Sequence, residues 1–185
     1  AAQVGADAAV TRLAEGWLRR RDPDRPLFLF LFYMDPHWDY LPPPSLAALF
    51  TGDPLPPPRN VNALGRAAPP PPGAVRARAR AAYLGEVRGT DACFGRLLAA
   101  VAASPRAEAT AVALCGDHGE AFWERGLPGH GNNLHDEELR VPLIVRAPGP
   151  PAPGAAVAGQ AGLIDLAPTL LDLAGVPPPP SWEGR

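Results

Sequence analysis

The chain has 185 residues and a formal net charge of −2 at pH 7, and 46% of its residues are hydrophobic. This length can bury a real core, so we expect one domain or part of one, without disulfides or a structural metal to hold it together. The small net charge leaves no basic surface for nucleic acid or anionic lipid, and we expect no nucleic-acid partner. All 17 basic residues are arginines, so no lysine is available as a catalytic base or phosphate clamp.

The first residues predict an amphipathic helix rather than a signal peptide. Val10, Leu13, Trp17 and Leu18 recur at helical spacing, and no charged start is followed by an apolar block. No stretch reaches the roughly 18 consecutive apolar residues of a membrane span, so we predict no transmembrane segment in this chain. The chain has no initiator methionine and opens within the helical pattern, which leads us to expect that further residues precede it.

Residues 26–34, PLFLFLFYM, form a short continuous apolar run that is rich in aromatic residues. Such a run predicts a strand covered on both faces. The next stretch, DPHWDYLPPP, turns the chain at the strand end, and residues 41–72 are punctuated by prolines with little periodicity. We interpret residues 41–72 as an irregular surface excursion within one partial domain that spans residues 1–185.

The remaining elements alternate between helix and strand patterns. Residues 74–102 repeat apolar positions three, four and seven apart, which predicts a long helix. Residues 110–116 and 140–148 are strand candidates, and residues 163–176 predict a helix that ends at Gly175. The order of elements predicts an α/β fold with a mixed, mostly parallel sheet flanked by helices on both faces.

The two cysteines, Cys93 and Cys115, fall in a predicted helix and a predicted strand. These positions fit buried thiols better than a disulfide framework or a CxxC site. They identify no cellular compartment.

Two polar motifs follow predicted strands. Asp35-Pro36-His37 comes after residues 26–34, and Asp117-His118, within CGDHGE, comes after residues 110–116. Ligands of open α/β sheets collect at the carboxyl ends of strands, and carboxylate oxygens and imidazole nitrogens both bind divalent ions. The dipeptide leaves a second interpretation open, in which Asp117 caps a helix and His118 is a surface residue.

The sequence around these motifs resembles the sulfatase family of the alkaline-phosphatase superfamily. GDHGEAFWERGLPGHGNNLHDEELRVPLIVRAPG is similar to the family's S-D-H-G-E stretch, its G-H-G or G-K-G turn and its R-V-P-L-I strand. FLFLFYMDPHWDYLPPP, YLGEVRGTDACFGRLLAAV and LIDLAPTLLDLAGVPPP are similar to three further family motifs, in the same order. The resemblance covers nearly the whole chain from Pro26 and implies an incomplete alkaline-phosphatase-like fold.

The resemblance implies roles for four residues. Asp117 and His118 would be two ligands of a divalent metal, calcium first, with manganese, magnesium or zinc as alternatives. His37 and His130 would face the bound sulfate or phosphate, and one of them would protonate the leaving oxygen. A Lewis acid and imidazoles suit this reaction because negative charge develops on the peripheral and leaving oxygens. The alternatives are that His37 shapes a turn and that His130 is an ordinary loop residue.

Three other polar residues are interpreted as structural. His135 opens a helical turn, Asp91 lies in the long helix, and Glu120 orients His118 or caps the next helix.

One part of the family pattern is not found in this chain. The family's nucleophile is a cysteine or serine in a C-x-P-S-R or similar motif, and the cysteine is converted to formylglycine. Cys93 in DACFGR and Cys115 in LCGDH lack the proline and arginine of that motif. We therefore expect this chain to be the C-terminal portion of a sulfatase-type catalytic domain, with the nucleophile and an aspartate pair of the metal site in an upstream half.

Three function hypotheses follow. In the first, the intact protein is a metal-dependent hydrolase of small-molecule, carbohydrate or lipid sulfate esters, and this chain alone is inactive. In the second, it is a phosphodiesterase, phosphonate hydrolase or phosphoglycerol transferase that acts on a phosphate ester. In the third, the chain is a non-catalytic remnant or a binding module.

Overall fold

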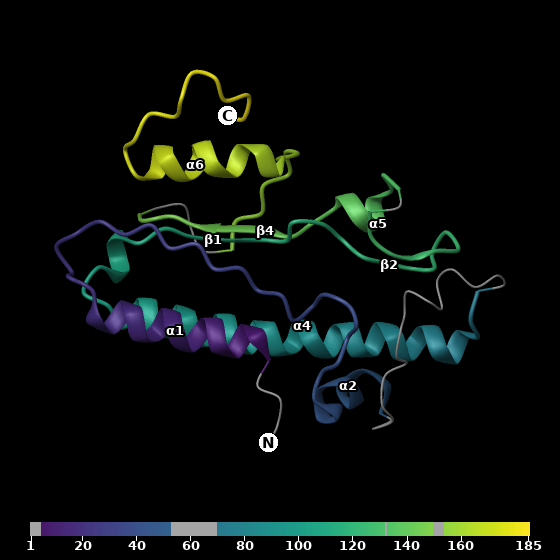
Figure 1. Ribbon diagram of the computed structural model, residues 1–185. Coiled ribbons are helices and arrows are strands. Elements are labelled where there is room, and N and C mark those ends of the chain that lie inside the picture. The colour runs from purple at the N-terminus through teal and green to yellow at the C-terminus, as the bar shows by residue number, and fades with distance from the viewer. Residues whose placement is uncertain (1–4, 53–69, 132, 150–153) are drawn as a thin grey trace.

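The computed structural model describes residues 5–52, 70–131, 133–149 and 154–185 (Figure 1). Its longer helices are α1 (Ala6–Arg20), α2 (Pro44–Thr51), α4 (Gly73–Ala102) and α6 (Leu166–Leu173), and α5 (Asp136–Leu139) is a single turn. Its strands are β1 (Val112–Cys115), β2 (Ala121–Phe122), β3 (Pro128–Gly129) and β4 (Leu143–Arg146). Short 3-10 turns occupy Ala107–Ala109 and Leu163–Asp165.

The elements form layers around a narrow ribbon of β1 and β4. Helix α6 lies on one side of this ribbon, and α1 and α4 lie next to each other on the other side (Figure 1). None of the helices in the described ranges combines the length and apolarity needed to cross a membrane.

The prediction of a mostly parallel sheet is wrong for the part of the chain that the structure describes. β1 pairs with β4 in antiparallel register, with Val112 opposite Arg146, and β2 pairs with β3 in a second antiparallel pair. Residues 26–34, predicted as a central strand, are not assigned to a strand. Among the described residues no strand pairs with this run, and a run that suits a doubly covered strand cannot supply the neighbouring strand itself.

The other predicted elements are largely confirmed. The N-terminal helix, the long helix and the two strand candidates coincide with α1, α4, β1 and β4. Gly175 has φ of 70° directly after the last helix, a left-handed conformation that ends helices. The excursion at 41–72 is partly helical, because its first residues form α2, and its residues 53–69 lie outside the described parts. Both cysteines are free, but neither is fully buried as predicted: Cys93 is half-buried and Cys115 is exposed.

The core of the described structure joins three segments through aromatic rings. Ala79 and Ala82 of α4 are fully buried, and their small side chains let Tyr40 and Trp123 pack against the helix at 1% and 4% exposure. The Tyr40 ring centroid lies 5.4 Å from that of Tyr83, an edge-on arrangement favoured by aromatic quadrupoles. This cluster fixes the segment after residue 34 and the β2–β3 hairpin on one helix.

Glu86 of α4 is a half-buried carboxylate at the edge of this core. Its Oε1 accepts a hydrogen bond of 2.9 Å from the Leu41 backbone N–H. Burial, with smaller contributions from the Asp35 and Asp7 charges, raises the pKa of Glu86 from 4.5 to about 7. In the folded protein this carboxyl therefore holds its proton at pH values where the unfolded chain has lost it.

We predict that Glu86 lowers stability as the pH rises from 4.5 to about 7, because the unfolded state binds fewer protons in that interval. Glu86→Gln keeps the acceptor oxygen and has no charge, so this loss should be smaller in the variant. The measurement is the denaturation midpoint of both proteins at about pH 5 and about pH 8. Glu108→Gln, at an exposed position, is the control. Equal pH dependence in wild type and Glu86→Gln would contradict the assignment.

Candidate functional site

The Asp117-His118 pair lies in the turn that follows β1. The turn is held by backbone hydrogen bonds from Gly116 N–H to the Pro142 carbonyl, at 3.2 Å, and from Gly119 N–H to the Glu138 carbonyl, at 2.7 Å. A Cβ on Gly119 would collide with the Glu137 carbonyl. Glycine is needed here because α5 lies against the turn, which leaves no space for a side chain.

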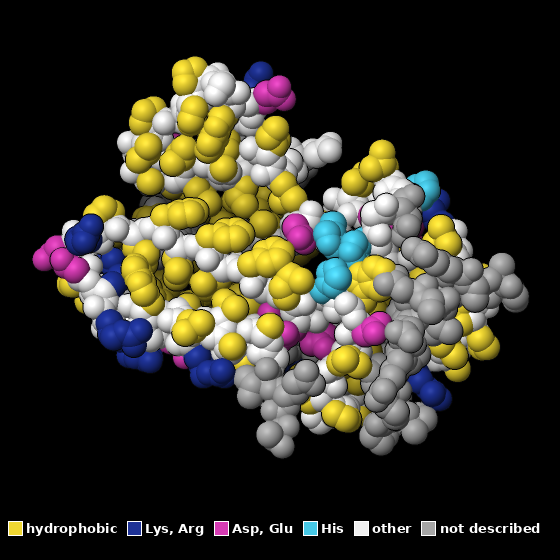
Figure 2. Space-filling model, viewed as in Figure 1, with side chains coloured by type: hydrophobic (Ala, Val, Ile, Leu, Met, Phe, Trp, Pro, Cys, Tyr) yellow, Lys and Arg dark blue, Asp and Glu magenta, His cyan; other side chains and the backbone are white. Residues whose placement is uncertain are grey.

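Three of the four predicted site residues are histidines that meet at this turn. The His118 and His130 rings stack with centroids 4.0 Å apart, and the His37 ring lies 5.2 Å from His130 at an edge-on angle. Figure 2 shows histidine side chains gathered on one face, with acidic side chains beside them. The fourth residue, Asp117, is adjacent, with its Oδ1 3.9 Å from His118 Nε2. Segments far apart in the sequence thus bring His37, Asp117, His118 and His130 together.

Glu120 and His130 face each other because of the hairpin register. Ala121 lies opposite Gly129 in the β2–β3 pair, so the next pair outward is Glu120 and His130. The His130 Nδ1 atom is 3.1 Å from Glu120 Oε1, and the Glu120 side chain is 5% exposed. Sequence reasoning assigned Glu120 to His118 or to a helix cap, and this was wrong. A hairpin interpretation of AFWERGLPGH would have found the correct partner.

Trp38 contacts the other nitrogen of His130. The Trp38 indole N–H donates to His130 Nε2 at 3.3 Å, and the two rings meet edge-on with centroids 5.4 Å apart. An indole N–H is only a donor, so His130 Nε2 accepts here and Nδ1 carries the proton directed at Glu120. His130 is therefore held in one orientation from both sides.

The Tyr40 phenol also interacts with the Glu120 carboxylate. Burial raises the pKa of Tyr40 strongly, and the charge of Glu120 and its hydrogen bond with the phenol add to this effect. The phenol therefore remains a neutral hydrogen-bond donor for the Glu120 carboxylate.

His37 and His118 each have one ring nitrogen bound to a backbone carbonyl. His118 Nδ1 lies 2.8 Å from the Gly119 carbonyl oxygen, and His37 Nδ1 lies 3.0 Å from the Trp38 carbonyl oxygen. A carbonyl can only accept, so the proton sits on Nδ1 and the Nε2 lone pair of each neutral ring is available. Both side chains are exposed, so these nitrogens can reach a ligand.

The donor set of Asp117 and His118 fits part of a divalent-metal site. An exposed carboxylate stands beside an imidazole whose Nδ1–H is fixed by a carbonyl, the arrangement that orients metal-binding histidines. Within the described ranges, no group of three or more histidine, cysteine or acidic side chains is placed to hold a metal ion. Two donors provide an open, incomplete coordination shell.

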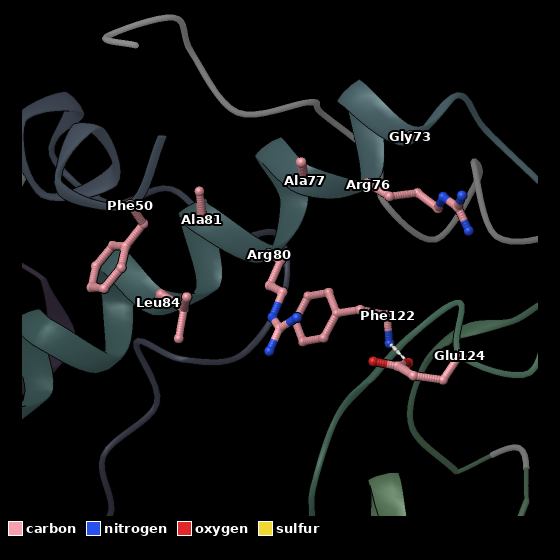
Figure 3. Close-up of a pocket in the computed structure, with 9 residues that line it drawn as sticks. All are labelled: Phe50, Gly73, Arg76, Ala77, Arg80, Ala81, Leu84, Phe122 and Glu124. Atoms are coloured by element: carbon pink, nitrogen blue, oxygen red, sulfur yellow. Dashed lines mark hydrogen bonds between the residues drawn. The ribbon is translucent and has the colours of Figure 1, made fainter. Parts of the chain in front are cut away.

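A cavity beside α4 is lined by none of the histidines. It has a volume of about 480 Å³ and is lined by Phe50, Gly73, Arg76, Ala77, Arg80, Ala81, Leu84, Phe122 and Glu124 (Figure 3). Its acid, Glu124, accepts a hydrogen bond from the Phe122 backbone N–H. The cavity offers no imidazole, thiol or hydroxyl group, so we place the candidate site at the histidine cluster.

The residues interpreted as structural lie outside the cluster. His135 is the N-cap residue of α5, and its N–H donates to Asn133 Oδ1 at 2.8 Å, which confirms that it opens a helical turn. Asp91 is exposed on α4 and pairs with Arg88 at 3.0 Å.

The sequence matches the sulfatase family over residues 3–176. The chain therefore belongs to the sulfatase family.

Individual relatives agree with this assignment. An arylsulfatase of Clostridium perfringens is 29% identical over 196 residues, which cover 91% of this chain and 38% of the relative. A choline-sulfatase of Rhizobium meliloti is 35% identical over 98 residues, which cover 53% of this chain and 19% of the relative. This chain thus spans less than half the length of these relatives.

Solved structures show the same fold. The phosphonate monoester hydrolase SpPMH from Silicibacter pomeroyi superposes with a TM-score of 0.71 at 26% identity, over 97% of this chain and 40% of that one. The protein BT4656, solved in complex with its substrate D-glucosamine-2-N,6-O-disulfate, superposes with a TM-score of 0.69 at 21% identity, over 97% of this chain and 50% of that one. The described elements are therefore part of a larger sulfatase fold.

We predict that the 185-residue chain by itself binds divalent ions weakly, with dissociation constants on the order of 10⁻³ M, because Asp117 and His118 are the two metal ligands expected among the described residues. Titration calorimetry with calcium and with manganese measures this affinity. Micromolar binding that Asp117→Ala abolishes would show a more complete site than the one assigned here.

Proposed function

We propose that this chain carries part of the catalytic site of a metal-dependent sulfate-ester hydrolase. The observation that carries the proposal is the meeting of His37, His118 and His130 beside Asp117 in a chain of the sulfatase family. The nucleophile, a formylglycine or a serine, is proposed to lie in a portion of the catalytic domain upstream of this chain.

Asp117 and His118 would hold the divalent ion, with calcium as the first candidate and manganese, magnesium or zinc as alternatives. When bound, the ion supplies Lewis-acid stabilisation of charge on the ester oxygens. His118 presents Nε2 for this task because its Nδ1–H donates to the Gly119 carbonyl. The adjacent carboxylate of Asp117 provides the negative charge that a divalent ion favours.

His37 is the better candidate for proton transfer to the leaving oxygen. Its Nδ1–H donates to the Trp38 carbonyl, so in the imidazolium form the second proton is on Nε2, from which it would pass to the leaving oxygen and leave the ring neutral. His130 has both nitrogens engaged, by Glu120 and by Trp38. In this arrangement His130 serves to position the neighbouring imidazoles of His37 and His118.

The substrate class proposed is a sulfate ester of a small molecule, carbohydrate or lipid. The named activities of the arylsulfatase and choline-sulfatase relatives support sulfate esters. A phosphonate or phosphate ester is the second candidate, supported by the 26% identity to a phosphonate monoester hydrolase over 97% of this chain.

The histidine roles are tested in the intact protein, with this chain joined to the nucleophile-bearing portion. We predict that His37→Ala or His118→Ala lowers the turnover of an aryl sulfate by roughly 10²–10⁴-fold, because each removes a group that acts on the developing charge. His135→Ala is the matched control, since His135 lies outside the cluster at the start of α5. Circular dichroism should show the same fold in all three variants; activity lost only through unfolding would mean that these histidines are structural.

The chain alone should show no turnover of aryl sulfate or aryl phosphate esters, because groups that act as a unit lose most of their effect without the nucleophile. The purified 185-residue chain is assayed with both esters against buffer. Turnover that survives both His37→Ala and His118→Ala would contradict the assigned roles.

An intact protein that prefers a phosphonate monoester to the aryl sulfate would support the second candidate, and one that hydrolyses neither ester would support a non-catalytic chain.

A further inference from the structure

Asp7 and Asp35 exchange hydrogen bonds between two segments that are distant in sequence. Asp7 Oδ1 accepts the backbone N–H of Met34 at 2.7 Å and that of Asp35 at 3.1 Å. In return, Asp35 Oδ1 accepts the N–H of Ala6 at 2.8 Å and its Oδ2 accepts the N–H of Asp7 at 3.3 Å. We call this reciprocal arrangement the Asp7–Asp35 pair.

Each carboxylate satisfies backbone groups that would otherwise be unpaired. The first N–H groups of a helix have no partner within the helix, and Gly5, the N-cap of α1, has no side chain to cap them. Asp35 takes this role from outside the helix, where a negative charge is also favoured by the helix dipole. Asp7 does the same for the turn that begins at Met34.

Asp7 is also tied to α4. The Thr90 hydroxyl donates to Asp7 Oδ2 at 2.5 Å, and the Asp7 side chain is fully buried. A buried carboxylate is tolerated when donors surround it, and here Met34, Asp35 and Thr90 provide them. Burial raises the pKa of Asp35, and repulsion from the Asp7 charge adds to this effect, whereas the N–H groups of Asp7 and Ala6 oppose it.

Gly5 shows that the fit is tight. Its φ of −53° and ψ of 157° are open to any residue, so backbone conformation does not require glycine. A Cβ at this position would instead overlap the Asp35 carboxylate. Glycine at position 5 is explained by the space that Asp35 occupies.

The pair holds the turn that carries His37. The His37 N–H donates to the Met34 carbonyl at 3.0 Å, so the turn starts at the residue whose own N–H Asp7 binds. The same turn continues to Trp38, which contacts His130. A shift of Met34 therefore moves His37 and Trp38 together.

From these contacts we propose that Asp7 is a positioning residue of the candidate site: with Asp35 and Thr90 it fixes the His37 turn against α1 and α4. This proposal rests on the proposed function only in assigning a role to His37. The placement of the turn is testable without any assay of activity.

The first experiment measures hydrogen–deuterium exchange in the intact protein. Asp7→Ala removes the acceptor, so we expect exchange over residues 33–40 to rise while β4 stays unchanged. Asp7→Asn keeps one acceptor oxygen for Met34 and Asp35 and should restore most of the protection. Asp91→Ala is the matched control, because Asp91 follows Thr90 on α4 but is exposed. Unchanged exchange in Asp7→Ala, or an Asn variant as loose as the Ala variant, would overturn the proposal.

The second experiment uses Gly5→Ala, whose added methyl group competes with the Asp35 carboxylate. We expect it to loosen residues 33–40 as Asp35→Ala does, and the double variant to be no looser than Asp35→Ala alone, because both changes break one contact. Additive effects would show that Gly5 acts elsewhere and would overturn the assignment.

Activity provides a third, separate readout. If the intact protein hydrolyses the aryl sulfate, Asp7→Ala should lower kcat by roughly tenfold or more with KM changed less than about twofold, because misplacement of a reacting group mainly affects the chemical step. Asp7→Asn should recover kcat. An equal fall in the Asp7→Asn variant would overturn the positioning role. Absence of turnover in the wild type would refute the proposed function, whereas the exchange experiment would still decide the placement of the turn.

Discussion

The candidate site depends on the packing of Tyr40 and Trp123 against the alanine face of α4. Tyr40 follows the His37 turn, and Trp123 belongs to the loop of the hairpin that carries Glu120 and His130. Because Ala79 and Ala82 present no bulk, both aromatic rings reach the same short stretch of helix. Two segments about 80 residues apart are thereby brought into one layer, and the histidines meet where that layer reaches the surface.

Carboxylates then give the loops a defined shape. Glu120 fixes the His130 ring, and Asp7 binds the turn before His37. Glu138, which is 5% exposed, accepts the N–H of Gly131 at 2.7 Å and the amide of Asn133. Backbone N–H groups in loops have no ladder partners, so buried acids such as Asp7 and Glu138 accept hydrogen bonds from them. The acids around the site thus have structural roles that are separate from metal binding.

The sequence was informative wherever a signal is local. Helical periodicity predicted α1 and α4, and the motifs after residues 34 and 116 placed His37, Asp117 and His118 at chain turns, whereas His130 was assigned from the family resemblance. The partner of Glu120 was missed because a two-residue hairpin strand has no periodicity to detect. Asp7 was missed for a different reason: an acid in the first turn of a helix is common and its long-range role requires the fold. The predicted sheet direction was wrong because the orientation of a strand pair depends on which strand is the partner. The sequence of one apolar run does not reveal that partner.

The apolar run at residues 26–34 shows how a burial pattern reflects a whole domain. Tyr33 faces inward, where its hydroxyl lies 3.0 Å from that of Thr11, whereas Phe28, Phe30 and Phe32 on the opposite face are 80%, 73% and 52% exposed. Each uncovered phenylalanine forgoes about 1.5–3 kcal/mol of burial, so such a face is stable only when a further layer covers it. The solved sulfatase-fold chains contain further residues, since this chain spans only 40% and 50% of them. One cause therefore explains both the sequence signal for a doubly covered strand and the exposed aromatic face. The run is suited to packing on both of its faces, and the described residues cover one face.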